Sequence, residues 1–177
     1  SNLWFMPATP VLSNGGTKRG LPISCFLNEA SDSLGGILDL WSENVWLAAK
    51  GGGIGSYWGN PRSIGEKIGR VGKTSGIIPF IKVMDSLTMA ISQGSLRRGS
   101  AACYIPIDHP EIEEFIEMRR PTGGDPNRKS LNLHHGVLVS DAFMRAVEMD
   151  EQWGLKSPKD GAVQATVSAR NLWIRLL

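Results

Sequence analysis

The chain has 177 residues, 41% of them hydrophobic and 20% charged, so it is long enough to bury one sizeable core as a single domain or a large part of one. Its net charge of +2 and its lack of a long basic run argue against a nucleic-acid polymer or a membrane as the main partner. No apolar run approaches the length of a membrane span and no secretion signal is evident, so we expect a cytoplasmic protein.

Turn residues, caps and apolar spacing predict the elements. Pro7 and Pro10 favour extended backbone, while Asp32 and Ser33 are candidate helix caps. In the first part of the chain we expect an extended segment over 3–12, a turn-rich segment, a strand over 21–27, a helix from Leu34 that stops at the glycines of 51–55, and a loop to Gly76. A helix from Pro79 to about Gly94, a strand over 101–105, a helix opened by His109-Pro110 and a strand over 131–139 should follow. The last elements should be a short helix from Ser140 or Asp141 to Met149, a polar hairpin-like region over 153–160 and a helix from about Ala162. This alternation predicts an α/β architecture with largely parallel strands.

Both ends of the sequence look cut. The chain opens within the apolar run Leu3-Trp4-Phe5-Met6 and closes within another, residues 172–177, with no capping or stop signal beyond it. We therefore expect part of a longer protein. Two cysteines are too few for a disulfide scaffold in a domain of this size, so reduced thiols are the simpler interpretation.

Cys25 is the first candidate for chemistry. It lies in the strand-like run of residues 21–27, directly after a glycine-rich turn, so a stiff element would fix its direction while mobile backbone lets a ligand come close. The alternative is a buried, inert thiol, because free cysteine usually behaves as a small hydrophobe. For Cys103, in an apolar strand, the core interpretation is preferred.

Two glycine-rich segments fail as nucleotide-binding motifs. Residues 51–55 lack the third glycine of a dinucleotide fingerprint and follow a helix, not a strand. Gly72-Lys73-Thr74 resembles the end of a P-loop, but Lys67 stands where its first glycine is required. For residues 51–55 this leaves a glycine helix cap and a flexible loop.

Basic residues on the glycine-bearing loops are suited to phosphate. Arginines and lysines there could grip phosphate oxygens while backbone amides assist, and solvated surface charge is the equal alternative. These residues are Arg62, Lys67, Arg70, Lys73, Arg97 and Arg98. His134 and His135 are adjacent on a predicted strand and should face opposite sides, and His109 suits a cap, so no metal site is expected.

Taken together, the segments resemble one enzyme family. The runs PATPVLSNGGTKRGLPISCFL, DSL, GGGIG, SGIIPFIKVMDS, SQGSLRRGSAACYIPIDHPEIEEFIEMR and GGDPNRKSLNLHHGV are similar, in order and spacing, to the large catalytic α subunit of class I ribonucleotide reductase. The resemblance implies that residues 1–177 are part of the catalytic barrel domain, the first half of a ten-stranded α/β barrel incomplete at both ends. The helices over 34–50 and 79–94 would help to form an α-subunit homodimer.

The resemblance also implies a substrate site. Cys25 matches the reducing cysteine that delivers hydrogen as the ribose 2′-hydroxyl leaves as water and then forms a disulfide with a cysteine much later in the chain. Thr9 and Ser24 match positions that contact the substrate, and Gly53 matches a glycine at which the backbone approaches the substrate closely. The substrate would be a ribonucleoside diphosphate.

A regulatory region over about 32–100 is implied as well. Asp32, Ser33 and Leu34 match a site that binds a deoxynucleoside triphosphate or ATP as effector at the dimer interface. Matching effector-phosphate residues are Arg62 and Arg70. Gln93 and Arg97 fall in the loop that would relay effector identity to substrate choice.

The rest of the machinery would lie outside this chain. The family's radical cysteine and the partner of Cys25 lie beyond Leu177, a metal-containing small β subunit supplies the radical, thioredoxin or glutaredoxin restores the thiols, and no metal is expected in this segment. The segment alone should therefore reduce nothing. A nucleotide-binding and dimerisation module of a split reductase is the alternative, and a structural fragment without a ligand is a third hypothesis.

Overall fold

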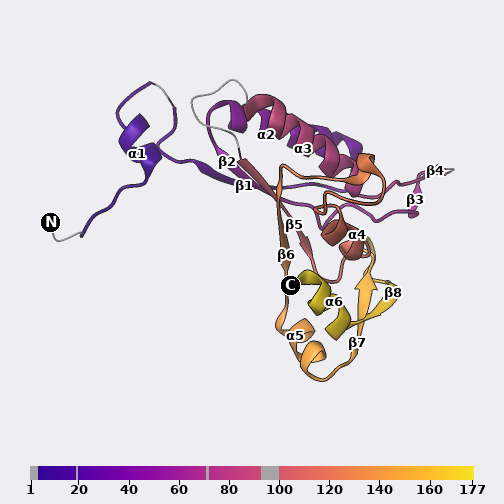
Figure 1. Cartoon of the computed structure of the whole chain (residues 1–177). Coiled ribbons are helices and arrows are strands. Elements are labelled where there is room, and N and C mark those ends of the chain that lie inside the picture. The colour runs from indigo at the N-terminus through magenta and orange to yellow at the C-terminus, as the bar shows by residue number, and fades with distance from the viewer. Residues whose placement is uncertain (1–3, 19, 71, 93–99) are drawn as a thin grey trace.

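A four-stranded parallel sheet forms the centre of the computed structural model, which describes residues 4–18, 20–70, 72–92 and 100–177 (Figure 1). Its strands are, in spatial order, β1 (Cys25–Glu29), β2 (Gly53–Tyr57), β5 (Ser100–Pro106) and β6 (His134–Leu138). All three pairings are parallel, so each connection crosses over the sheet, as the alternation of helices and strands predicts.

Two long helices cover one face of this sheet. They are α2 (Leu34–Ala49) and α3 (Ile78–Ser92), which lie side by side in Figure 1. Trp41 of α2 and Phe80 of α3 pack with ring centroids 6.0 Å apart, while Leu40 and Ile81 are buried. As predicted, Ser33 caps α2, because its side chain accepts a hydrogen bond from the amide of Gly36 at 3.0 Å.

Polar side chains lock β1 to α2. The Ser56 hydroxyl donates to Asn28 at 2.7 Å, Asn28 donates to Asn44 at 2.8 Å, and Asn44 donates back to Ser56 at 3.1 Å. Each group in this closed ring is therefore paired where burial would otherwise penalise it. The ring fixes the direction of β1 and, with it, the residues at both of its ends.

The remaining elements form a smaller layer and two hairpins. They are α4 (Ile112–Glu117), a 3-10 turn η1 (Pro126–Arg128), α5 (Asp141–Glu148), α6 (Ala169–Leu176), the antiparallel pair β3 (Lys67–Ile68) and β4 (Gly72–Lys73), and the antiparallel pair β7 (Gln152–Lys156) and β8 (Val163–Ser168). Phe143 of α5 meets Trp153 of β7 edge to face at 5.2 Å. Phe143 belongs to the same buried cluster as the residues between the sheet and the long helices, and Trp153 packs against that cluster.

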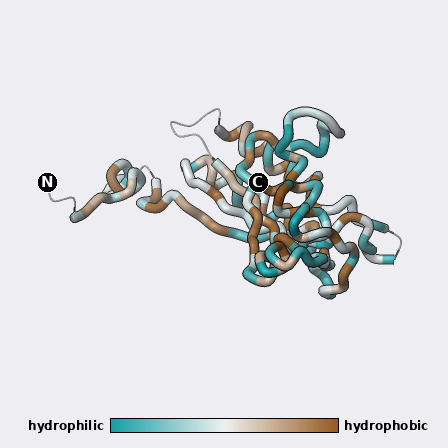
Figure 2. Tube along the Cα trace, turned by 60° about the horizontal axis from the view of Figure 1, so that its bottom comes forward, coloured by the Kyte–Doolittle hydropathy of each residue, from teal (hydrophilic) through white to brown (hydrophobic). Residues whose placement is uncertain are grey.

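The expected extended segment over residues 3–12 is wrong in its second half. The structure has a short helix there, α1 (Thr9–Asn14). Ala8 keeps the extended conformation that precedes a helix, and Pro10 lies in the first turn, where its missing N–H and fixed φ cost nothing. Figures 1 and 2 show this arm standing away from the body of the molecule.

The expected glycine loop over residues 51–55 hides an interior strand. Gly51, at φ 78°, does end α2, but Gly53 begins β2, which pairs with β1 on one side and β5 on the other. At Gly55 a Cβ would lie 2.7 Å from the exposed Leu27 side chain, which would have to shift, and 3.3 Å from the Tyr104 ring. The glycines therefore serve close strand packing, which local turn chemistry does not reveal.

The last helix begins later than predicted. Residues 163–168 form β8, which completes a hairpin with β7, and α6 starts only at Ala169. Ser168 caps α6 by accepting from the amide of Asn171 at 3.2 Å. The predicted hairpin region is thus correct in type but extends past Asp160, because the β-branched residues of 163–167 favour a strand.

One face of the sheet is open. Cys25, Leu27 and Glu29 point to this face and are exposed, with Leu27 87% exposed, whereas Phe26 and Asn28 point to the helices.

Within the described ranges, no helix is both long and apolar enough to cross a membrane.

Candidate functional site

A cavity of about 390 Å³ lies where the start of α2, the loop after β2, the β3–β4 hairpin and the start of α3 meet. Its lining is Asp32, Ser33, Leu34, Ile37, Pro61, Arg62, Ile68, Gly69, Thr74, Gly76 and Phe80. We call it the α2 pocket. It brings together four residues that the sequence analysis placed in an effector site: Asp32, Ser33, Leu34 and Arg62.

An ion pair joins the two sides of the α2 pocket. Nε of Arg62 donates to both carboxylate oxygens of Asp32 at 3.0 Å, Nη2 donates to Oδ2 at 2.7 Å, and the Arg62 amide donates to Oδ1 at 3.0 Å. Nη1 donates to the carbonyl of Lys67 at 2.6 Å. Three of the five guanidinium N–H groups are thus used, and the other two have no partner among the described residues.

The pair is charged near neutral pH. Burial alone would raise the pKa of Asp32, but hydrogen bonds from Arg62 and the charge of that guanidinium lower it below its usual value. Hydrogen bonding to Asp32 and its charge raise the pKa of Arg62. The positive charge of Lys159, at the tip of the β7–β8 hairpin, also lowers the Asp32 pKa.

The walls of the α2 pocket are mostly apolar. Ile37 and Phe80 come from the two long helices, while Ile68 comes from the β3–β4 hairpin. The first turn of α2 also opens here, and its amides form the positive end of a 16-residue helix. An arginine, a helix N-terminus and apolar walls in one cavity suit a ligand with an anionic group and a flat ring.

Of the other residues predicted for the effector site and its loop, the structure describes Arg70. Arg70 lies in the turn of the β3–β4 hairpin, next to Gly69, but does not line the α2 pocket. Gln93 and Arg97 lie outside the described residues. Ser100, which follows them in the chain, pairs with Gly53.

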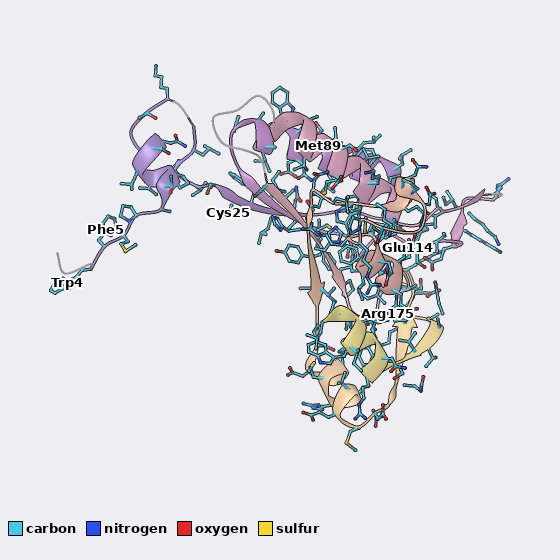
Figure 3. The ribbon with its side chains drawn as sticks, viewed as in Figure 1. Trp4, Phe5, Cys25, Met89, Glu114 and Arg175 are labelled. Carbon is cyan, nitrogen blue, oxygen red and sulfur yellow. The ribbon has the colours of Figure 1, made fainter. Side chains whose placement is uncertain are left out.

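Cys25 lies at the other end of β1. It is the first residue of the strand, is exposed, and pairs in register with Gly53 of β2 (Figure 3). The Gly53 amide donates to the carbonyl of Ser24 at 2.5 Å. The structure therefore brings three predicted substrate-site residues together at one edge of the sheet, with the thiol open to a ligand.

Thr9 is not brought to that group. It is the first residue of α1, and Figure 1 shows α1 set apart from the sheet on the N-terminal arm. Of the four predicted substrate-site residues, Ser24, Cys25 and Gly53 therefore lie together and Thr9 lies apart.

Cys103 has the opposite setting. It is fully buried on the helix-covered face, and its sulfur donates weakly to the His134 carbonyl at 3.6 Å. Burial raises its pKa to about 12. The prediction that Cys103 is a core residue is confirmed.

Two carboxylates that support the α2 pocket were not predicted. Glu111 is 4% exposed and accepts hydrogen bonds from the amide of Ile64, two residues after Arg62, and from the amide of Ile77, directly before α3. Burial raises its pKa to about 7. Glu66 accepts from the amide of Ser63 at 2.8 Å. The sequence alone does not distinguish Glu66 and Glu111 from ordinary surface acids. The groups that they bind are backbone amides or, for Glu66, side chains about 90 or more residues away in the chain.

Comparison with known proteins agrees with this arrangement. The sequence model described as "Ribonucleotide reductase, barrel domain" matches residues 23–173. The putative ribonucleoside-diphosphate reductase large subunit of Frog virus 3 (isolate Goorha) is 49% identical over 174 residues, which are 98% of this chain and 29% of that protein.

More distant relatives carry the same description. The ribonucleoside-diphosphate reductase large subunit of Invertebrate iridescent virus 6 is 39% identical over all of this chain and 18% of its own length. The α subunit of Chlamydia pneumoniae is 36% identical over 90% of this chain and 15% of its own length. This chain thus spans less than a third of the length of these curated relatives.

Proposed function

The chain belongs to the ribonucleotide reductase family, whose barrel domain it matches, and we propose that it works within a large subunit that reduces ribonucleoside diphosphates to deoxyribonucleotides. The observation that carries this proposal is the exposed Cys25 at the strand edge beside Gly53, in a chain with large-subunit relatives. Oxidoreductase chemistry follows from the family. The particular substrate and the roles of residues are our inference.

Cys25 would act as a hydrogen donor and reductant. In the proposed reaction the ribose C2′–O bond breaks, the hydroxyl leaves as water, and a C2′–H bond forms. Two thiols, those of Cys25 and of a cysteine elsewhere in the subunit, lose two hydrogens and form one disulfide, which balances the reaction. Thioredoxin or glutaredoxin would then reduce that disulfide, and a metal-containing small subunit would supply the initiating radical.

The strand edge suits this role. β1 fixes the direction of Cys25, while Gly53 has no side chain between the thiol and an approaching sugar. Nothing packed against the thiol has to move, because Cys25 is exposed.

The α2 pocket would bind a deoxynucleoside triphosphate or ATP as effector. Arg62 and the amide end of α2 would face the phosphates, and the apolar walls would hold the base. Exposed apolar residues on the outer side of α2 and α3 favour a homodimer that covers these helices. They are Leu34, Leu38, Trp46, Val83 and Met89.

The test is reduction of a ribonucleoside diphosphate by the full-length protein assembled with its small subunit. Cys25→Ser should reduce turnover to the assay background, because serine cannot form the disulfide. Cys103→Ala should retain turnover, since the buried thiol has no part in the reaction. Normal turnover by folded Cys25→Ser would refute the assigned role.

A further inference from the structure

The β7–β8 hairpin is tied to the loop that carries Arg62. Oε1 of Glu66 accepts hydrogen bonds from the hydroxyl of Ser157 and from the side-chain amide of Gln164, the latter at 2.8 Å. The Ser63 hydroxyl in turn donates to Oε1 of Gln164 at 3.0 Å. These contacts join segments about a hundred residues apart, and Ser63 and Ser157 are both buried.

The same contacts fix the position of Arg62. Both hydrogen-bond donors of its neighbour Ser63 are held, the amide by Glu66 and the hydroxyl by Gln164. Arg62 itself can then reach Asp32 and the Lys67 carbonyl together. Without the hairpin, the loop would keep the contact of Ile64 with Glu111 and that of the Ser63 amide with Glu66, but the Ser63 hydroxyl would lose its acceptor and Glu66 would lose two donors.

The hairpin also brings a charge toward the α2 pocket. Ser157 organises the tip: its amide donates to the Ala162 carbonyl at 2.9 Å and its hydroxyl accepts from the Lys159 amide at 3.2 Å. Lys159 is exposed, and its amide binds the same Ser157 hydroxyl that donates to Glu66, so the tip of the hairpin lies against the loop that carries Arg62. Its positive charge lowers the pKa of Asp32.

We propose that the β7–β8 hairpin is part of the nucleotide site: Ser157 and Gln164 position the Arg62 loop through Glu66, and Lys159 adds positive charge for the phosphates. Glu66 is then a positioning residue, which holds the arginine without touching the ligand. This inference rests on the proposed function of the α2 pocket as a nucleotide site.

Calorimetric titration of the full-length protein with dTTP tests the positioning role. Glu66→Ala and Gln164→Ala should each raise the Kd about fivefold, the ratio that corresponds to one net hydrogen bond. The double variant should raise the Kd by less than the product of the two single effects, because the bond between Gln164 and Glu66 is lost in both single variants. Glu66→Gln, which keeps an acceptor for the Ser63 amide, should recover part of the affinity.

Glu151→Ala is the matched control, since Glu151 is an exposed acid just before β7 and should leave the Kd unchanged. Thermal unfolding curves show which variants are folded, and the exposed Gln164 carries the test if Glu66→Ala does not fold. Failure of the wild-type protein to bind dTTP would refute the nucleotide pocket itself. Wild-type binding that folded Gln164→Ala and Glu66→Ala match would overturn only the inference about the hairpin.

The charge is tested on the same hairpin. Lys159→Ala should weaken dTTP binding about two- to threefold at low salt, with a smaller loss at high salt, because exposed charges are screened. Lys156→Ala removes a lysine that lies 3.9 Å from Asp108 and should have no effect. Equal Kd values for the two variants would remove Lys159 from the proposal.

Discussion

At the scale of residues, burial separates groups of the same type. Cys25 and Cys103 both lie on parallel strands, but Cys25 points to the open face and Cys103 to the face under α2 and α3. A buried thiol with a pKa of about 12 stays protonated and has no access to a substrate. Strand alternation therefore decides which of the two can react.

Glu111 gives a prediction about pH and stability. Burial raises the pKa of Glu111 in the folded protein to about 7, above its ordinary value of 4.5, so the folded protein binds the proton more tightly than the unfolded chain. The stability that this proton contributes is complete below about pH 4.5 and is lost as the pH rises through 7. The Glu111→Gln variant cannot titrate at this position. Between pH 4.5 and 7 its free energy of unfolding should therefore fall by less than that of the wild-type protein, by on the order of 2–3 kcal/mol.

Urea unfolding at pH 5 and pH 7.5 measures this difference. The comparison with the variant is needed because His109, whose buried side chain has a pKa lowered to about 4, titrates in the opposite sense. His109 is the same in both proteins, so its contribution largely cancels. The same change in unfolding free energy in both proteins would contradict the buried-carboxylate account.

At the scale of elements, α3 joins the two candidate sites. Phe80, in the first turn of α3, lines the α2 pocket. The end of α3 leads in sequence to Ser100, which pairs with Gly53 beside Cys25. Midway, Asp85 is 1% exposed and accepts hydrogen bonds from Ser130, Asn132 and Leu133. Asp85 thus anchors the segment before β6 to α3.

Loss of this anchor should be costly. Burial alone would raise the pKa of Asp85, but the hydrogen bonds from Asn132 and its neighbours outweigh this effect and lower the pKa below its usual value. The carboxylate is therefore ionised. Asp85→Ala would leave buried donors unpaired and should lower the free energy of unfolding by about 3–5 kcal/mol. Asp39→Ala, on the exposed side of α2, should change it by less than about 0.5 kcal/mol. Denaturant unfolding measures both, and equal effects would refute the anchor.

Elements with a strong local signal were predicted well. The cap at Ser33 and the apolar spacing after it predicted α2 nearly to the residue, and the short helix predicted from Ser140 or Asp141 to Met149 is observed as α5. β2 was missed because its glycines indicate a turn locally, whereas in the structure Gly55 packs closely against Leu27 and Tyr104 on the neighbouring strands. Such tertiary contacts are absent from any local pattern.

At the scale of the whole molecule, the two candidate sites lie at opposite ends of β1. Cys25 begins the strand and Asp32 follows its end, so they are separated by a strand about 13 Å long. Four parallel strands with one open face agree with part of a family barrel. The resemblance predicted most of the residues that gather at each end, although Thr9 and Arg70 lie apart from them. It did not predict the Glu66 and Glu111 contacts, because these depend on how distant segments pack.

The most direct test of the account follows the Cys25 thiol through one turnover. The full-length protein and its small subunit would reduce a ribonucleoside diphosphate without an external thiol reductant, and iodoacetamide labelling with peptide mass spectrometry would then report each cysteine. We predict that Cys25 loses reactivity in proportion to the deoxyribonucleotide formed, while the labelling of Cys103 stays unchanged. Deoxyribonucleotide formed while Cys25 remains fully reactive would contradict the account.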